Sequence, residues 1–266
     1  MKKFWLWLTF AAVLSFAGLS AGCGGQKDPP KEGKQAVLRV GMDAAYPPFG
    51  FQDMNSKEYI GFDVDIIKAI AKEEHLETEI KNLNFDGLIP SLKSGDLDVA
   101  INDITITEDR KKSVDFSKRY YIAGLGAVVR KENDSITKRD DLKGKVLGVT
   151  IGSTGEEAAR KIEGATLRVY NTLSDAFIDL KNGAVEAVIN DIPTNEYYVA
   201  KTGDQSVKTA PIALTDEDLG IAVKKGNTEL LQKIDSGLAK IKKNGKFTEI
   251  YLKWFGKEPP AELLKE

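Results

Sequence analysis

Apolar residues recur along the chain in two different patterns from residue 37 onward. Short continuous runs at residues 37–40 and 97–101 are typical of buried strands. Between them, residues 62–71 carry apolar side chains at helical spacing, and residues 88–92 continue the alternation. Strands that alternate with helices predict an α/β fold in which each sheet is mainly parallel and is flanked by helices.

The same alternation returns after residue 142. Residues 146–149, 167–170 and 185–189 predict strands, and helices are predicted from about residue 155 and through residues 176–180. The order of the elements in this second half resembles the order in the first half. We therefore expect two structural units of similar topology.

An internal repeat supports this division. Residues 92–103 and residues 180–191 are identical at six of twelve positions, and each segment ends in an Asn-Asp pair. Both predict the end of a helix, a glycine C-cap, a buried strand and then the Asn-Asp pair just past the strand. Ligands of open α/β sheets bind at this carboxyl edge. The alternative is that Leu-Lys-x-Gly is only a common connection between a helix and a strand, which would leave the repeated Asn-Asp pair unexplained.

The length of 266 residues also favours two lobes, at about 150 residues per domain. Residues 120–129 predict a strand that leaves the first lobe, and residues 218–223 predict a strand that returns to it. Two such crossings form a hinge. We therefore predict lobe 1 at residues 37–123 plus 220–258, lobe 2 at residues 124–219 and a C-terminal tail at residues 259–266.

The N-terminal region predicts export. Residues 1–22 begin with a basic Met-Lys-Lys and continue with an apolar run that is too short for a permanent membrane helix, which is typical of a signal peptide. The Leu-Ser-Ala-Gly-Cys sequence that ends at Cys23 resembles a bacterial lipobox, although Ser20 stands where leucine is usual. The resemblance implies lipid modification of Cys23; the alternative is an unmodified cysteine behind an ordinary signal. Residues 23–36 predict a flexible tether.

The composition narrows the possible chemistry. The chain has 42% hydrophobic and 29% charged residues, which is typical of a globular protein. One Cys and one His exclude an intrachain disulfide, a Cys-rich zinc site and any mechanism that needs two histidines. The net charge of −2, spread along the chain, provides no basic surface for nucleic acid. We expect no cofactor, no metal and no nucleic acid partner.

Candidate ligand-binding residues follow the predicted strands. Asp43 and Tyr46 lie on a proline-stiffened loop after the first strand, where Tyr46 could present an aromatic face or pack under the loop. Asp43 could meet a ligand or cap its own turn. Phe85 precedes a predicted helix and could stack on a ligand or cover the helix end.

Two further segments contain groups that could bind an anion. Arg110 lies one turn into a short helix after the first Asn-Asp pair, and its guanidinium matches a carboxylate, with the Thr105 hydroxyl to complete the shell. The alternative is that Arg110 is only a solvated helix residue, which its place beside a strand-end loop makes less favoured. Ser153 or Thr154 fits the N-cap of a capping box, at a helix end that could also receive a carboxylate. No Gly-Lys-Ser/Thr follows, which argues against a nucleotide.

Six motifs occur together with the lipobox-like segment: Asp-x-x-Tyr-Pro-Pro-Phe at 43–49, Gly-Phe-Asp-Val-Asp at 61–65, Phe-Asp-Gly-Leu-Ile-Pro at 85–90, Ile-Thr-Ile-Thr-x-x-Arg at 104–110, Gly-Ser-Thr-Gly at 152–155 and Trp-Phe-Gly at 254–256. In this combination and order, the chain resembles the polar amino-acid substrate-binding proteins of bacterial ABC importers. The resemblance implies a two-lobed clamshell of the type II periplasmic binding proteins with a two-strand hinge. It implies a monomer that binds one L-amino acid and delivers it to a membrane permease. Its location would be extracytoplasmic, anchored through Cys23 on the outer face of a Gram-positive membrane or in a periplasm.

The resemblance also implies a role for each site residue. Arg110 would bind the α-carboxylate together with Thr105 and the backbone of Thr154 and Gly155. Asp191 would bind the α-ammonium. The aromatic walls would be Tyr46 and Phe85, and the residues facing the end of the ligand side chain would be Asp43, Asn102, Thr150 and Asn190. Position 103 is usually small in this family and is Asp here, and Thr150 stands where some glutamine binders have lysine.

The balance of charge predicts the substrate. Arg110 and Asp191 neutralise the ligand's zwitterion, which leaves Asp43 and Asp103 without a cation in this set of residues. Because an unpaired carboxylate is costly in a closed cleft, we expect a basic amino acid, with arginine first and then lysine or histidine. If Asp103 instead caps the turn at residues 104–107, glutamine is the alternative. A dehydratase-like enzyme with Asp103 as general acid is a remote alternative, and we expect no catalysis.

Overall fold

The structure is a computed structural model that describes residues 36–201 and 205–265. The predicted signal peptide, Cys23 and the tether up to residue 35 lie outside these residues. Within the described part of the chain, no helix is long and apolar enough to cross a membrane.

The first sheet contains five strands. Its order is β5 (Leu76–Asn82), β1 (Ala36–Met42), β6 (Val99–Ala100), β15 (Ala222–Lys224) and β7 (Val114–Phe116). β1 pairs in parallel with β5 and β6, whereas β15 is antiparallel to β6 and β7. This sheet and the helices packed on it are called lobe 1 here.

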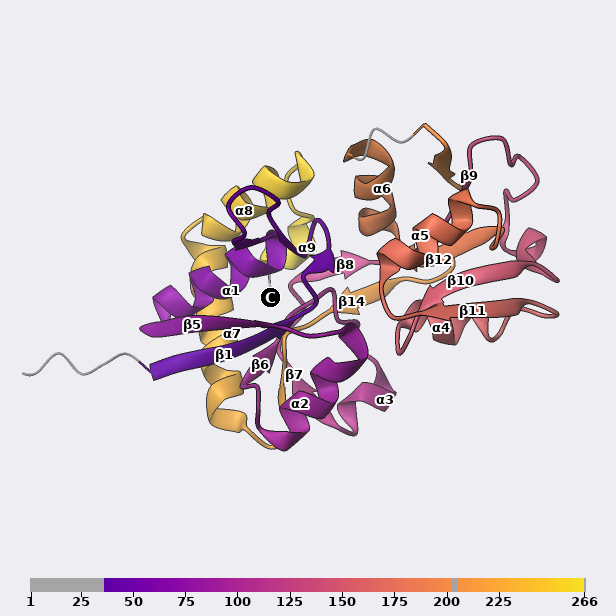
Figure 1. The fold of residues 1–266 in the computed structure, drawn as a ribbon. Helices are drawn as coiled ribbons and strands as arrows, with labels where there is room; N and C mark the ends of the chain where they lie inside the picture. The colour runs from indigo at the N-terminus through magenta and orange to yellow at the C-terminus, as the bar shows by residue number, and fades with distance from the viewer. Residues whose placement is uncertain (1–35, 202–204, 266) are drawn as a thin grey trace, which may run out of the picture. The chain divides into compact units, whose positions relative to one another are not determined.

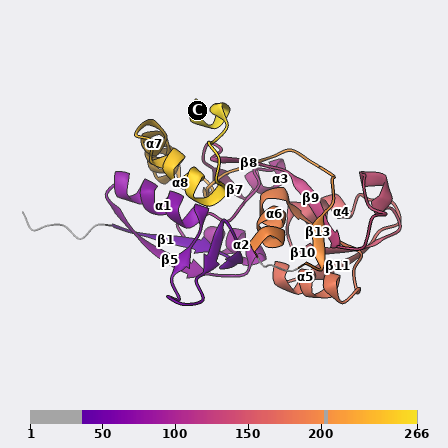
Figure 2. The ribbon, with the colours of Figure 1, turned by 90° about the horizontal axis from the view of Figure 1, so that it is seen from above.

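Helices cover both faces of the lobe 1 sheet (Figures 1 and 2). On one face, α1 (Phe62–Glu73) packs with α7 (Thr228–Lys243) and α8 (Lys246–Phe255), and Ile66, Ile67 and Ile70 of α1 are fully buried there. Leu88 and Leu92 of α2 (Leu88–Ser94) cover the other face. The helical spacing of the apolar residues therefore produced the expected buried faces.

The second sheet repeats this arrangement and defines lobe 2. Its order is β11 (Thr166–Tyr170), β10 (Val146–Thr150), β12 (Ala187–Asp191), β9 (Leu125–Arg130) and β13 (Val207–Thr209). The three strands β11, β10 and β12 are parallel, and β9 is antiparallel to both neighbours. Its helices are α4 (Thr154–Ala159), α5 (Leu173–Lys181) and α6 (Ile192–Lys201).

A separate pair of strands, β8 (Tyr121–Ala123) and β14 (Glu217–Leu219), runs antiparallel between the two sheets (Figure 1). Each continues into the antiparallel strand of one sheet, β8 into β9 and β14 into β15. The prediction of one strand for each crossing was therefore wrong, because glycine interrupts both. A Cβ at Gly124 would lie 2.4 Å from the Thr215 carbonyl oxygen, and a Cβ at Gly220 would lie 2.8 Å from the Ile106 side chain.

Three other expectations need correction. The strand expected at residues 97–101 is limited to Val99 and Ala100, and β12 includes Asn190 and Asp191 instead of ending before them. The expected C-terminal tail contains α9 (Ala261–Leu264), whose Leu263 is fully buried. The remaining short elements are β2 (Ala45–Tyr46), β3 (Gly50–Gln52), β4 (Tyr59–Ile60), η1 (Phe85–Gly87), α3 (Glu108–Lys111) and η2 (Arg139–Leu142).

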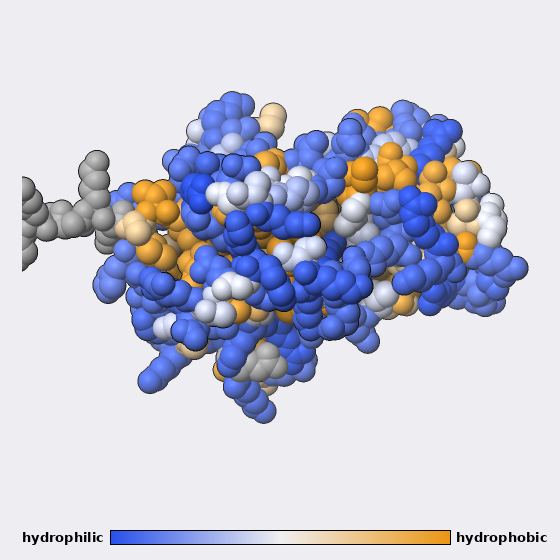
Figure 3. Space-filling model, turned by 90° about the horizontal axis from the view of Figure 1, so that it is seen from below, coloured by the Kyte–Doolittle hydropathy of each residue, from blue (hydrophilic) through white to orange (hydrophobic). Residues whose placement is uncertain are grey.

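The surface is mainly hydrophilic on the face seen from below, with several separate hydrophobic patches (Figure 3). Large apolar side chains that are exposed include Val37, Met54, Val169 and Ile178, which belong to different elements or loops. Scattered apolar residues of this kind are normal on soluble domains.

Candidate ligand-binding site

A small cavity lies where the two lobes meet. Its volume is about 10 Å³, which is room for about one water molecule. Eight of the nine lining residues are predicted site residues, and Ser153 is the ninth. The eight are Tyr46, Phe85, Asp103, Thr105 and Arg110 from lobe 1, and Thr150, Thr154 and Asp191 from lobe 2.

The fold explains why residues so distant in sequence meet. Tyr46 follows the carboxyl end of β1, and Asp103 follows that of β6. In lobe 2, Thr150 ends β10 and Asp191 ends β12. The carboxyl ends of the parallel strands in both sheets therefore face one cavity, as expected for open α/β sheets.

Arg110 links the two lobes. Its guanidinium donates from Nη1 to the Thr105 carbonyl oxygen at 2.9 Å and from Nη2 to the Gly152 carbonyl oxygen at 3.0 Å. The guanidinium carbon lies 5.4 Å from the centre of the Phe85 ring, so this ring stacks on Arg110. Burial lowers the pKa of the guanidinium, while acidic groups, including Glu157 and Glu217, act in the opposite direction.

Asp103 faces the cavity. Its backbone has a positive φ of 52°, and its N–H donates to Asp63 Oδ2 at 2.8 Å. Its Oδ2 accepts from the Thr194 hydroxyl at 3.4 Å, whereas its Oδ1 has no hydrogen-bond partner in the described part of the protein. The turn that leads into α3 is capped by Thr107, which accepts from the Arg110 N–H at 3.1 Å.

Asp191 faces the same cavity from lobe 2. The Tyr46 hydroxyl donates to Asn190 Oδ1, and Asp191 Oδ2 lies 3.3 Å from the same hydroxyl oxygen. Burial and the nearby Glu217 carboxylate raise the pKa of Asp191 to about 7. Burial, followed by the carboxylates of Asp191 and Asp63, also raises the pKa of Asp103. The cavity therefore disfavours a further negative charge.

Four predicted site residues do not line the cavity, namely Asp43, Asn102, Gly155 and Asn190. Asp43 accepts from the Ala45 N–H at 3.0 Å, so it caps its own turn, and its N–H donates to Asn102 Oδ1 at 2.9 Å. Asn190 accepts from Tyr46, as described above. Gly155 packs so tightly that a Cβ would lie 2.8 Å from the Ile189 carbonyl oxygen.

The cap of α4 is Ser153, not Thr154. Its Oγ accepts from the Glu156 N–H at 3.0 Å. The Glu156 side chain, which completes a capping box when it returns to the cap residue, accepts instead from the Gly152 N–H at 2.7 Å. This geometry fixes the Gly152 carbonyl that receives Arg110.

Sequence reasoning missed two carboxylates beside the cavity. Glu217 Oε2 accepts from the hydroxyls of Thr105 at 2.5 Å and Thr154 at 2.9 Å. Asp63 holds the backbone of Asp103, and burial raises its pKa to about 7. Asp63 belongs to the motif at residues 61–65 and could have been noticed there, but Glu217 lies in an acidic hinge segment with no informative pattern.

Several buried polar atoms around the cavity have no hydrogen-bond partner within the described protein. An unsatisfied buried polar group costs about 1–3 kcal/mol. The atoms without a partner are Asn102 Nδ2, Asp103 Oδ1, Thr150 Oγ1, Asn190 Nδ2 and Asp191 Oδ1. A polar guest in the cavity would reach the atoms of the lining residues Asp103, Thr150 and Asp191, so these atoms favour a polar ligand.

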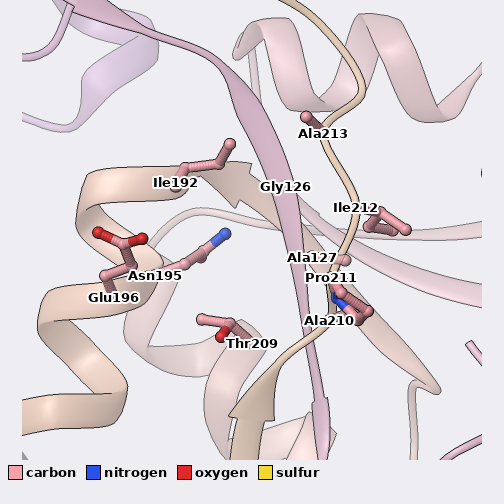
Figure 4. Close-up of a pocket in the computed structure, with 10 residues that line it drawn as sticks. All are labelled: Gly126, Ala127, Ile192, Asn195, Glu196, Thr209, Ala210, Pro211, Ile212 and Ala213. Atoms are coloured by element: carbon pink, nitrogen blue, oxygen red, sulfur yellow. The ribbon is translucent and has the colours of Figure 1, made fainter. Parts of the chain in front are cut away.

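A larger pocket of about 370 Å³ lies on lobe 2, between β9, α6 and residues 209–213 (Figure 4). None of the predicted site residues lines it, so it is distinct from the cavity described above. Across residues 36–201 and 205–265, no group of three His, Cys, Asp or Glu side chains could hold a metal ion.

Comparison with known proteins identifies relatives over almost the whole described chain. Residues 38–257 match the bacterial extracellular solute-binding proteins, family 3. The L-cystine-binding protein TcyJ of Escherichia coli (strain K12) is 36% identical over 225 residues, which are 84% of each chain. The arginine-binding extracellular protein ArtP of Bacillus subtilis (strain 168) is 33% identical over 258 residues, which are 96% of this chain and 98% of its own.

Solved structures agree with the fold. An ancestral arginine-binding protein bound to glutamine has a TM-score of 0.81 and 47% sequence identity, and covers 84% of this chain and 99% of its own. The predicted family and the two-lobed type II fold are confirmed by these matches. The named relatives are binding proteins, not enzymes.

Proposed function

Because the chain belongs to family 3 of the bacterial extracellular solute-binding proteins, we propose that it captures a basic L-amino acid, arginine first, for an ABC importer. The observation that carries this proposal is the excess of buried carboxylates over cations at the cavity. Asp103, Asp191 and Glu217 surround the single guanidinium of Arg110. A ligand with a cationic side chain reduces this imbalance, whereas a neutral zwitterion does not.

The ligand's backbone groups have matching partners. The Arg110 guanidinium, with Thr105 and the backbone of Thr154 and Gly155, binds the α-carboxylate. The Asp191 carboxylate binds the α-ammonium, and Tyr46 with Phe85 provides apolar walls for the side chain. Asp103 attracts the distal cation through its free Oδ1. Asp43, Asn102, Thr150 and Asn190 form the surrounding polar shell.

The two lobes move apart to admit the ligand and close on it. A cavity of about 10 Å³ is too small for an amino acid, and groups from both lobes line it. A ligand that contacts both lobes favours the closed form by its differential affinity. The closed protein then delivers its amino acid to the permease as a monomer, held at the outer membrane face by a lipid on Cys23.

Glutamine is the second candidate. The ancestral arginine-binding protein described above is known with glutamine bound and also with arginine bound. In this chain, the amide of glutamine would donate to Asp103 without neutralising it. The order of affinity between these two ligands therefore separates the candidates.

The test is a thermal-shift screen of the purified protein with the twenty L-amino acids, followed by calorimetry. Arginine is expected to give the largest rise in Tm. Agmatine, which keeps the guanidinium but lacks the α-carboxylate, serves as a matched control and is expected to give little rise. A larger rise with glutamine than with arginine supports the alternative, and no rise with any amino acid overturns the proposed function.

Lipid anchoring has its own test. Metabolic labelling with a radioactive fatty acid should label the natural chain and leave the Cys23→Ser variant unlabelled. Membrane fractionation should move the variant to the soluble fraction. Equal labelling of both chains would contradict the assignment of Cys23.

A further inference from the structure

Glu217 contacts both lobes from the strand that joins them. It lies in β14, and its Oε2 accepts from Thr105 in lobe 1 and from Thr154 in lobe 2. Its Oε1 accepts from the Thr215 hydroxyl at 3.0 Å. Glu217 is only 8% exposed, so these three hydroxyls provide its hydrogen bonds in place of solvent.

The two hydroxyls at the cavity cannot serve two carboxylates at once. A threonine hydroxyl has a single proton to donate. The Thr105 and Thr154 oxygens are 3.4 Å apart, and both have a donor contact to the same Glu217 oxygen. While this arrangement persists, the hydroxyls offer only lone pairs to an incoming carboxylate.

We propose that Glu217 competes with the α-carboxylate of the ligand for the hydroxyl protons of Thr105 and Thr154, and thereby sets the affinity of the site. This inference rests on the proposed function, because it assumes that Thr105 and Arg110 receive that carboxylate. Whenever the lobes are closed without ligand, the Glu217 carboxylate joins lobe 1, lobe 2 and the hinge strand. Binding requires the ligand to take the Thr105 proton from Glu217.

The competition concerns the α-carboxylate, which all amino acids share. Removal of Glu217 therefore strengthens binding of glutamine and of arginine. The gain is smaller for arginine, because Glu217 also contributes negative charge that attracts a cationic ligand. Asp103 and Asp191 set the preference for a basic side chain, and Glu217 sets the overall strength.

The experiment uses the full chain and compares Glu217→Ala with Glu258→Ala, a control that removes an exposed carboxylate far along the sequence from the cavity residues. Calorimetry should show that glutamine binds Glu217→Ala about tenfold more tightly, the effect of roughly one charge-assisted hydrogen bond. The control should be unchanged. Glu217→Gln, which keeps the side-chain size, should show a smaller gain and replaces the alanine variant if that variant does not fold.

A second measurement needs no ligand. Hydrogen exchange of the ligand-free protein should be faster in Glu217→Ala than in the natural chain at residues 103–111 and 150–156, because the connection between the lobes is lost. Weaker amino-acid binding in Glu217→Ala overturns the inference and makes Glu217 a positioning residue for Thr105. Unchanged exchange also overturns it. If the natural chain binds no amino acid, the proposed function fails, while the exchange result still tests the connection made by Glu217.

Discussion

The two Asn-Asp pairs begin from nearly the same sequence and end in different structures. In lobe 2, Asn190 and Asp191 remain in β12, opposite Gly126 and Leu125 of β9. In lobe 1, β6 pairs with β15 only through Val99 and Ala100. The chain then leaves the sheet and turns at Asp103, where φ is positive.

This difference decides what each pair can do. The lobe 2 strand holds Asp191 rigidly and contributes no cation of its own to the cavity. The lobe 1 turn is supported by Asp63 and leads directly into α3, which carries Arg110. The repeat therefore places one aspartate of each lobe at the cavity, and the segment that follows the first pair adds the cation, Arg110.

Removal of Arg110 is expected to have the largest effect on amino-acid binding. Arg110→Ala leaves carboxylates as the only ionisable side chains at the cavity that can carry a charge at neutral pH. Binding of every amino acid should therefore weaken by at least about 100-fold, as expected when one partner of a buried charge pair is lost. Calorimetry with arginine and glutamine measures the loss. The exposed Arg139→Ala variant is the control and should bind normally. Binding that survives in Arg110→Ala would exclude this guanidinium as the carboxylate site.

Asp63 supports the lobe 1 turn, and burial disfavours the charged form of its carboxyl group. Its folded pKa of about 7 lies above the ordinary value of 3.8, so the folded protein holds this proton more tightly than the unfolded chain. Its contribution to stability therefore falls as the pH rises from about 4 to about 7. Asp63→Asn, whose amide oxygen can still accept from Asp103, should raise the free energy of unfolding at pH 8 by on the order of 2 kcal/mol.

Denaturant unfolding of the natural chain and of Asp63→Asn at pH 4 and pH 8 tests the predicted direction of this pH dependence. The two proteins should differ little at pH 4. Asp115→Asn is the matched contrast, because the hydrogen bond from Lys225 lowers the pKa of Asp115 and its removal should reduce stability at neutral pH. An Asp63→Asn variant that loses as much stability at pH 8 as at pH 4 would show that the carboxylate is needed for packing.

Substitution of Asp103 tests whether Asp103 and Asp191 bind different parts of the ligand. Asp103→Asn keeps the shape of the side chain and removes one negative charge, so arginine should bind about tenfold more weakly. Glutamine should be affected much less, because it carries no distal charge. Calorimetric titration of both ligands measures the ratio, and an equal loss for the two would contradict the preference for a basic side chain.

The smallest effect is expected at the contact between the lobe 1 loop and the lobe 2 pair. Tyr46→Phe keeps the aromatic wall and removes the hydroxyl that donates to Asn190. The loss should be about fivefold for arginine and for glutamine alike, since one hydrogen bond contributes about 1 kcal/mol. Tyr170→Phe is the control, because it loses a hydroxyl bond to Asp179 away from the cavity. A selective loss of one ligand would indicate direct contact of the Tyr46 hydroxyl with the ligand side chain.

Local sequence patterns were sufficient to predict the α/β alternation, the two similar lobes and eight of the nine residues that line the cavity. They were sufficient because helical and strand periodicity is local, and because strand ends of a parallel sheet collect at one edge. Arg110 could likewise be predicted as a site residue, because it follows the first Asn-Asp pair closely in the sequence.

The hydrogen-bond partners of these groups could not be predicted from the sequence. No local pattern places Glu217 between Thr105 and Thr154, because the three residues come from the hinge and from opposite lobes. The same holds for Asp63 beneath Asp103 and for Asp43, which caps its own turn. Hydrogen bonds and buried charges depend on distances of a few ångströms between segments far apart in sequence, and folding alone sets those distances.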